Sequence, residues 1–334
     1  MSLPLILALL AVGAFILPGL LDDDDDDDKP VIRGTFEDDT IDGTDANEEI
    51  RGFRGDDTLN GLGGNDNIFG GEDDDTINGG PGLDFVRGGP GNDIISGDGG
   101  DDRLISDRGD DRVDGGFGAD VIRGGEGDDT ILGGPDARLV NGALVLNEAR
   151  ADSITGEEGN DTIYVWGDGS RANGAEDNDT LVAVSGDPTL TNGAGDNLNI
   201  ILANAEDDQT TDAIITDFDL DDDVLVLTID YASNATSDAY TGPVPDLVVS
   251  FVDVPGTDTQ GFGTLVTVGF PEGGTDFEND VFTESESSSV FLLGLTADVV
   301  EANLTFEAIL TEDADYSDPE ATVANQIMPA LPVV

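Results

Sequence analysis

Between residues 34 and 132 the hydrophobic and polar positions repeat every nine residues, a period that fits neither an isolated helix nor an ordinary strand. Each nine-residue block begins with a small residue, carries an acidic residue at position six and an aliphatic residue at position eight. Eleven blocks keep this register without an insertion, which indicates a true internal repeat. The blocks begin at Gly34, Gly43, Gly52, Gly61, Gly70, Gly79, Gly88, Gly97, Ser106, Gly115 and Gly124.

The aliphatic residue at position eight predicts the core of a solenoid. Glycines at positions one, two and four permit positive φ, so the first six residues of a block predict a tight turn. The last three predict a short strand with position eight pointing inward. Two turns and two strands make a coil of eighteen residues, and coils must stack because none buries enough apolar surface alone. Position eight holds Ile41, Ile50, Leu59, Ile68, Ile77, Val86, Ile95, Leu104, Val113, Ile122 and Ile131.

The acidic residue at position six predicts a cation site in every turn. Stacked coils align these carboxylates in two rows with no basic residue between them, and such rows need cations to close. Carboxylate and carbonyl oxygens in a flexible turn suit Ca²⁺, which takes six to eight oxygen ligands, better than Mg²⁺, which demands octahedral geometry. Position six holds Asp39, Glu48, Asp57, Asp66, Asp75, Asp84, Asp93, Asp102, Asp111, Asp120 and Asp129.

The blocks closely resemble the RTX, or haemolysin-type, calcium-binding nonapeptide GGxGxDxUx, most clearly in GGPGNDIIS from Gly88 and GGEGDDTIL from Gly124. The resemblance covers residues 34–132. It implies an all-β fold, a parallel β-roll, that binds several calcium ions through position-six aspartates and turn carbonyls. Carried over residue by residue, it names as ligands Asp57, Asp66, Asp75, Asp84, Asp93, Asp102, Asp111, Asp120 and Asp129.

The first two blocks depart from the pattern of this family. Glu37 and Ala46 replace the glycine at position four, and Glu48 replaces the aspartate at position six. We therefore expect these two blocks to lack normal calcium sites, and they are candidates for a cap on the roll.

Positions seven and nine of each block point outward, and alternate blocks lie on opposite sheets, so the roll has two unequal faces. The even-numbered blocks carry Phe69, Phe85, Arg87, Arg103 and Ile105, among other arginine and apolar residues, whereas the odd-numbered blocks are mostly small and polar. Such a mixture is typical of a partner-facing patch, and it predicts contact with an extracellular polysaccharide or a second copy of the chain. If a later part of the chain covers this face instead, these side chains will be buried.

The composition narrows the function classes. The chain has 334 residues with 74 acidic and 12 basic side chains, a net charge of −62, which argues against nucleic acid and anionic lipid surfaces as partners. It has no cysteine and no histidine, which excludes disulfides, thiolate zinc sites and histidine bases. No aspartate pair stands out as catalytic and Trp166 is the only tryptophan, so we predict a protein without enzymatic activity. The alternatives are a carboxylate-dependent polysaccharide-acting enzyme, or exported cargo with an RTX secretion module.

The amino-terminal segment predicts a membrane or export signal. Residues 1–21 are expected to form an apolar helix, and the uncharged run at 3–21 is just long enough to span a bilayer. A cleaved signal peptide with a small-residue site at residues 12–14 is the rival interpretation. Residues 22–33, with seven consecutive aspartates, predict an extended acidic linker. Together these features favour a cell-surface or extracellular protein tethered by its amino-terminal segment.

After residue 132 the repeat becomes irregular. We interpret residues 133–204 as degenerate repeats with an insertion that runs to about residue 146. The pattern of an acidic residue two positions before an aliphatic one returns at Asp152, Asp161, Asp179 and Asp196.

The carboxy-terminal part is poor in glycine and rich in β-branched residues. Residues 205–310 predict an antiparallel β domain that caps the roll, with strands near 247–252, 264–269 and 290–293 and a short helix at 296–303. Residues 311–334 predict an acidic tail.

Overall fold

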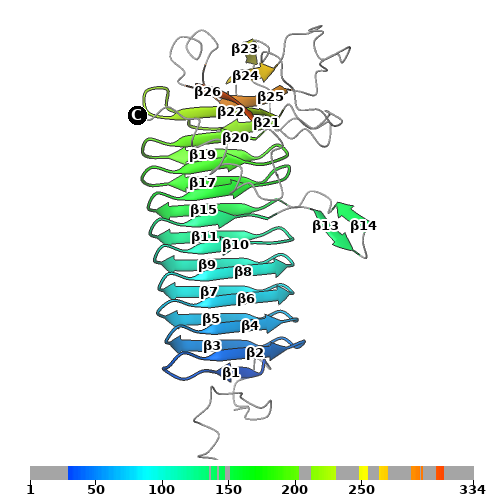
Figure 1. The fold of residues 1–334 in the computed structure, drawn as a ribbon, viewed down its shortest axis with the longest axis vertical. Coiled ribbons are helices and arrows are strands. Elements are labelled where there is room, and N and C mark those ends of the chain that lie inside the picture. The colour runs from blue at the N-terminus through cyan, green and yellow to red at the C-terminus, as the bar shows by residue number, and fades with distance from the viewer. Residues whose placement is uncertain are drawn as a thin grey trace, which may run out of the picture. The chain divides into compact units, whose positions relative to one another are not determined.

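The computed structural model describes residues 29–134, 137–140, 143–146, 151–202, 212–230, 248–254, 263–269, 287–293, 295 and 306–311. The regular elements in these ranges are all β-strands (Figure 1), which confirms the all-β class. No helix long and apolar enough for a membrane span occurs in this part of the chain. The helices expected at 1–21 and 296–303, and the tail beyond residue 311, lie outside it. The chain divides into two compact units, Met1–Asp161 and Thr162–Val334.

The first unit is a parallel β-roll in which consecutive strands enter opposite sheets (Figure 1). One sheet contains, in spatial order, β1 (Val31–Arg33), β3 (Glu49–Arg54), β5 (Asn67–Glu72), β7 (Phe85–Pro90), β9 (Arg103–Arg108), β11 (Val121–Glu126) and β15 (Ser153–Glu158). The other contains β2 (Thr40–Thr44), β4 (Thr58–Leu62), β6 (Thr76–Pro81), β8 (Ile94–Gly99), β10 (Arg112–Asp114) and β12 (Thr130–Leu132).

The register of these sheets follows the nine-residue period. Ile50 on β3 pairs with Ile68 on β5, and Leu59 on β4 pairs with Ile77 on β6, so each rung repeats after eighteen residues. Every aliphatic residue at position eight is buried, none more than 4% exposed. The predicted thin aliphatic core between two parallel sheets is therefore confirmed for residues 34–132.

The insertion after residue 132 contains a hairpin of its own. β13 (Ala137–Val140) and β14 (Ala143–Leu146) pair antiparallel, and the roll then resumes in the same register, with Ile122 on β11 opposite Ile154 on β15. The backbone N–H of Asp120 donates to Asp152 Oδ1 across 32 residues, where the regular coils span 18. The insertion thus forms a hairpin outside the two sheets, and the register of the coils is the same before and after it.

The second unit continues the same coil pattern and then changes it. One sheet contains β16 (Thr162–Val165), β18 (Thr180–Ala183), β20 (Leu198–Ile201), β22 (Val224–Asp230) and β26 (Phe306–Thr311), all parallel. The other contains β17 (Arg171–Ala175), β19 (Thr189–Gly193), β21 (Asp212–Ile215), β25 (Ser287–Leu293), β24 (Gly263–Gly269) and β23 (Val248–Val254). β23, β24 and β25 pair antiparallel, while β21 pairs parallel with β25.

One predicted register in this unit is wrong by a single residue. Leu181 on β18 pairs with Asn199 on β20, so position six falls on Asn197 and not on Asp196. The reason lies in the preceding turn. Gly193 and Gly195 take positive φ, of 88° and 110°, as positions two and four of a block do, so the turn places position six at Asn197 although the neighbouring Asp196 is the acidic residue.

Candidate metal centre

The nine predicted ligands of the first unit lie in two buried rows, one on each side of the roll. Each side chain is at most 3% exposed. Its Oδ1 accepts the backbone N–H of the position-six residue one coil earlier, at 2.7–2.9 Å. The local turn thus fixes the orientation of every carboxylate. One row contains Asp57, Asp75, Asp93, Asp111 and Asp129, and the other Asp66, Asp84, Asp102 and Asp120.

In seven of these nine carboxylates the second oxygen, Oδ2, is buried without a hydrogen-bond donor. A Cβ placed at Gly52 would lie 2.1 Å from Oδ2 of Asp57, and one at Gly88 would lie 2.2 Å from Oδ2 of Asp93, so position one must be small. A buried polar atom that lacks a partner costs on the order of 1–3 kcal/mol, and more when it is charged. Each turn therefore needs a positive charge or a donor. The unpartnered Oδ2 atoms belong to Asp57, Asp66, Asp75, Asp84, Asp93, Asp102 and Asp129.

Burial makes these carboxylates difficult to ionise in the absence of a cation. Desolvation and, to a smaller extent, the neighbouring carboxylates of the same row together raise the pKa of Asp93, Asp102 and Asp129 to about 8, although the accepted backbone hydrogen bond lowers it. The same causes raise the pKa of Asp75 to about 7 and that of Asp57 to about 6. A bound divalent cation would reverse this balance, because it stabilises the ionised form.

The donor set fits calcium. No group of three or more acidic side chains in the described residues is arranged to hold a metal by itself, so an ion at position six must take most of its ligands from the backbone. The turns supply them: a Cβ at Gly71 would lie 2.1 Å from the carbonyl oxygen of Phe53, and one at Gly91 would lie 2.0 Å from that of Asp73. Ca²⁺ accepts six to eight oxygen ligands in irregular geometry, which a glycine-rich turn can offer, whereas Mg²⁺ demands a near-ideal octahedron and retains its waters.

The comparison with known families agrees with this geometry. The model of the RTX calcium-binding nonapeptide repeat matches in four copies, at residues 51–86, 78–113, 105–139 and 148–170. These segments are RTX calcium-binding repeats. The matches begin where the regular position-six aspartates begin, and the last one includes the coil that follows the hairpin. No curated protein matches the chain.

The RTX roll has a second side-chain ladder that the sequence analysis missed. At position five, Oδ1 of Asp56 accepts the N–H of Asp74, and Oδ1 of Asp74 accepts the N–H of Asn92. This ladder reaches toward the following coil, whereas the position-six ladder reaches toward the preceding one. The signal was in the sequence: in blocks one to eleven, position five is Asp or Asn everywhere except at Leu83 and Ala119.

The position-six rows also extend beyond the nine residues taken as ligands. Asp152 Oδ1 accepts the N–H of Asp120, and Asp161 Oδ1 accepts the N–H of Asp129, both at 2.9 Å. Both side chains are buried. The two residues stand in the degenerate part of the sequence, where the insertion hides the nine-residue spacing.

In the part of the chain that the structure describes, the arginines on the outward face of β3, β5, β7, β9 and β11 are not buried, which speaks against the alternative that a later segment covers this face. Arg51, Arg87, Arg103 and Arg123 are exposed and the phenylalanines half-buried. We call this surface the Arg–Phe face; it consists of Arg51, Phe69, Phe85, Arg87, Arg103, Ile105 and Arg123.

The side chains of the Arg–Phe face interact with one another across neighbouring strands. The Arg51 guanidinium lies 5.7 Å from the ring centre of Phe69. The ring centres of Phe69 and Phe85 are 5.8 Å apart, and the Arg103 guanidinium lies 5.8 Å from the ring centre of Phe85. Cation–π contacts and tilted contacts between aromatic rings are favourable at these distances.

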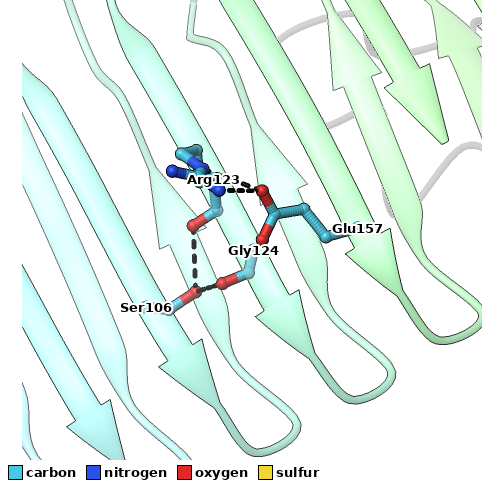
Figure 2. Close-up of polar contacts among 4 residues, drawn as sticks. All are labelled: Ser106, Arg123, Gly124 and Glu157. Atoms are coloured by element: carbon cyan, nitrogen blue, oxygen red, sulfur yellow. Dashed lines mark hydrogen bonds and ion pairs between the residues drawn. The ribbon is translucent and has the colours of Figure 1, made fainter. Parts of the chain in front are cut away.

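Carboxylates of the roll also neutralise part of the Arg–Phe face. The Arg123 guanidinium contacts the carboxylate of Glu157, one coil further on (Figure 2). Arg87 contacts Asp107 in the same relation, and Arg51 contacts Glu49 at 2.6 Å. The face is thus less basic than its sequence indicates.

Ser106 is the one residue that replaces glycine at position one of blocks one to eleven. Its buried hydroxyl donates to the carbonyl oxygen of Gly124, at 2.9 Å, one coil further on (Figure 2). Burial raises the pKa of Asp111, but only to about 6, because the backbone N–H of Asp93 and the Ser106 side chain lower it. The site around Asp111 therefore differs from its neighbours in the row.

Proposed function

We propose that this chain is a calcium-binding protein whose RTX roll folds as calcium fills the position-six rows, and that it has a structural or adhesive role outside the cell. The observation that supports this function is the series of buried carboxylates whose Oδ2 has no donor. Calcium is the ligand whose charge and coordination meet that demand in a turn rich in backbone oxygens.

Different residues of the roll have different roles in calcium binding. In the folded roll, Oδ1 of each of the nine position-six aspartates accepts a backbone N–H, which orients the carboxylate. The position-one glycine leaves the space beside Oδ2 open. Calcium supplies the positive charge that allows these carboxylates to stay ionised in a dry interior. Because unpaired buried acids oppose folding, the free energy of binding becomes free energy of folding.

The open, flexible turns favour a protein that works at extracellular calcium levels. Extracellular calcium modules bind with dissociation constants on the order of 10⁻⁴–10⁻³ M, well above cytosolic concentrations. A roll of this kind would stay unfolded inside the cell and fold outside it.

Calcium titration of the full-length chain tests this function. We expect β-type circular dichroism to appear as calcium is added to chelated protein at pH 8, and to disappear when chelator is added in excess. Magnesium at the same concentration is the control and should restore little of the signal. Identical spectra with calcium and with chelator would refute the function.

The segments outside the roll receive roles that rest on the sequence. We propose that residues 1–21 anchor the protein in a membrane, that residues 22–33 space it from the surface, and that the antiparallel strands of the carboxy-terminal part seal the last coil. Fractionation of the host tests the anchor: full-length protein should stay in the membrane pellet after a salt wash. A soluble form that begins near Phe15 would instead support a cleaved signal peptide.

The Arg–Phe face is the proposed contact surface for a polysaccharide or a second copy of the chain. Its support is the exposure of several arginines beside half-buried phenylalanines on a chain of net charge −62. The double variant Phe85→Ser, Arg87→Glu should lose surface binding or self-association while calcium-driven folding is kept. Unchanged binding would remove this role from the face.

The alternative of a carbohydrate-active enzyme lacks support from the roll. Such an enzyme needs two carboxylates that flank an accessible substrate. The position-six carboxylates of the first unit are buried and oriented by backbone hydrogen bonds, which suits ion binding and not proton transfer to a sugar.

A further inference from the structure

In the first coil of the roll (residues 34–51), protein hydrogen-bond donors stabilise the position-six carboxylates without a cation. Oδ2 of Asp39 accepts the backbone N–H of Thr35 at 2.5 Å and its hydroxyl at 2.9 Å. Oε2 of Glu48 accepts the backbone N–H of Thr44 at 2.8 Å, and Oε1 accepts the Thr44 hydroxyl at 2.5 Å. Both carboxylates are buried, as in the middle coils (residues 52–132), but neither is left without a donor.

The difference begins at position two of the block. Thr35 and Thr44 occupy this position in the first coil, and neither has a positive φ. In the middle coils position two is left-handed throughout, even where it is not glycine, as at Phe53 with φ of 92° and Leu62 with φ of 72°. The change of φ reorients the peptide, so only the threonines bring both an N–H and a hydroxyl to the carboxylate of their own turn.

The second unit contains an independent example of the same device. Oδ2 of Asp223 accepts the side-chain N–H of Asn192 and the backbone N–H of Asp219, both at 2.7 Å. Its Oδ1 accepts the backbone and side-chain N–H groups of Asn197, at 3.0 and 3.2 Å. Here an asparagine stands at position one, where the middle coils have glycine, and its amide takes the place of a cation.

We infer that these protein donors end the calcium rows, so that Asp39, Glu48 and Asp223 bind no calcium while the middle coils do. A calcium ion would have to displace two donors at Asp39, two at Glu48 and four at Asp223, and it would leave those donors without a partner. No such competition exists at the Oδ2 atoms of Asp57, Asp66, Asp75, Asp84, Asp93, Asp102 and Asp129. This inference rests on the proposed function, since it assigns the limits of the same sites.

Counting bound calcium tests the inference on the full-length chain. Native mass spectrometry of the calcium-saturated protein should give the same number of ions for wild type, Asp39→Asn and Glu48→Gln. The matched variant Asp93→Asn should bind at least one ion fewer. If Asp39→Asn or Glu48→Gln loses ions, the inference is overturned, and this outcome does not depend on whether Asp93→Asn folds.

A gain-of-site variant tests the same inference in the opposite direction. Thr44→Gly combined with Glu48→Asp restores the middle-coil residues at positions two and six and should add one calcium ion. A folded double variant, judged by circular dichroism, that binds no additional ion would contradict the role given to Thr44. If wild type itself binds no calcium, the proposed function fails, and that result is distinct from either outcome above.

Discussion

The first coil and the middle coils place a buried carboxylate at the same point of the same eighteen-residue turn, yet they stabilise it in opposite ways. In the first coil two threonines donate to the acid. In most of the middle coils one oxygen of the acid is left without a donor beside a glycine. We infer from the comparison that the acidic residue alone does not make a calcium site in this roll. In the first coil the residue at position two supplies the donors that the acid would otherwise lack.

The largest effect that we predict from this comparison is a pH dependence of folding in the absence of calcium. Burial raises the pKa of Asp93, Asp102 and Asp129 from an ordinary value of 3.8 to about 8. Between about pH 4 and pH 8 the folded chain holds protons that the unfolded chain has released, so the free energy of unfolding falls as pH rises. Chelated protein should therefore show more β-type circular dichroism at pH 5 than at pH 8, where the proposed function expects it to be unfolded.

Two single variants separate this effect from the general repulsion of an acidic chain. Asp129→Asn removes one buried titrating group and should weaken the pH dependence, whereas Glu126→Gln, at an exposed position at the end of β11, should leave it nearly unchanged. Equal β-type circular dichroism of chelated wild type at pH 5 and pH 8 would show that burial of the middle carboxylates does not oppose folding in the way that the comparison requires.

A smaller effect is expected from filling the space beside a middle-coil carboxylate. In Gly88→Ala the new Cβ would lie 2.2 Å from Oδ2 of Asp93 and 3.0 Å from the carbonyl oxygen of Ser106. Asp93 cannot swing aside, because its Oδ1 is bound to the N–H of Asp75. Such overpacking costs about 1–3 kcal/mol, and calcium affinity should fall with it.

Gly99→Ala is the matched control, because a Cβ there meets no atom within 4 Å. Urea unfolding in saturating calcium measures both variants. If Gly88→Ala and Gly99→Ala are equally stable, the position-one glycine does not serve to make room for the carboxylate.

The smallest predicted effect concerns a hydrogen-bond donor of the first coil. Thr44→Val removes the hydroxyl that donates to Glu48 while the backbone N–H donor remains. We expect a loss of about 1 kcal/mol in the free energy of unfolding. The number of bound calcium ions should not change. Thr58→Val, on the outward side of β4, is the control and should be close to neutral; a larger loss there than at Thr44 would count against the capping role.

Most of the fold of the first unit could be predicted from the sequence, because each coil is specified by nine neighbouring residues. Glycine at position one, the acid at position six and the aliphatic residue at position eight are local signals, and the structure places Gly88, Asp93 and Ile95 as that pattern requires. The predicted site residues came together for the same reason. The register failed only where an acidic residue and the turn glycines disagreed, at Asp196 and Asn197.

What the sequence did not predict depends on contacts between coils. The donors of Thr35 and Thr44 require a particular φ at position two, which a repeat pattern does not reveal. The ion pair of Arg87 with Asp107 joins residues twenty apart, so the arginine stripe looked more basic than it is. The strands of residues 205–310 have no period to fix their partners, and their mixed parallel and antiparallel pairing was accordingly not foreseen.

The ladders at positions five and six have a consequence for how such a chain can change length. One side chain reaches forward and the other backward across most boundaries between coils, as at Asp56 and Asp75, and only the forward acceptor is missing at Leu83 and Ala119. Most boundaries of the regular roll are therefore chemically alike. Duplication or loss of eighteen residues inserts or removes one rung and leaves both faces intact. A change of nine residues keeps the core but moves every later block to the opposite sheet, so it would scatter the Arg–Phe face over both sides. Selection on that surface would thus permit the roll to grow only in whole turns.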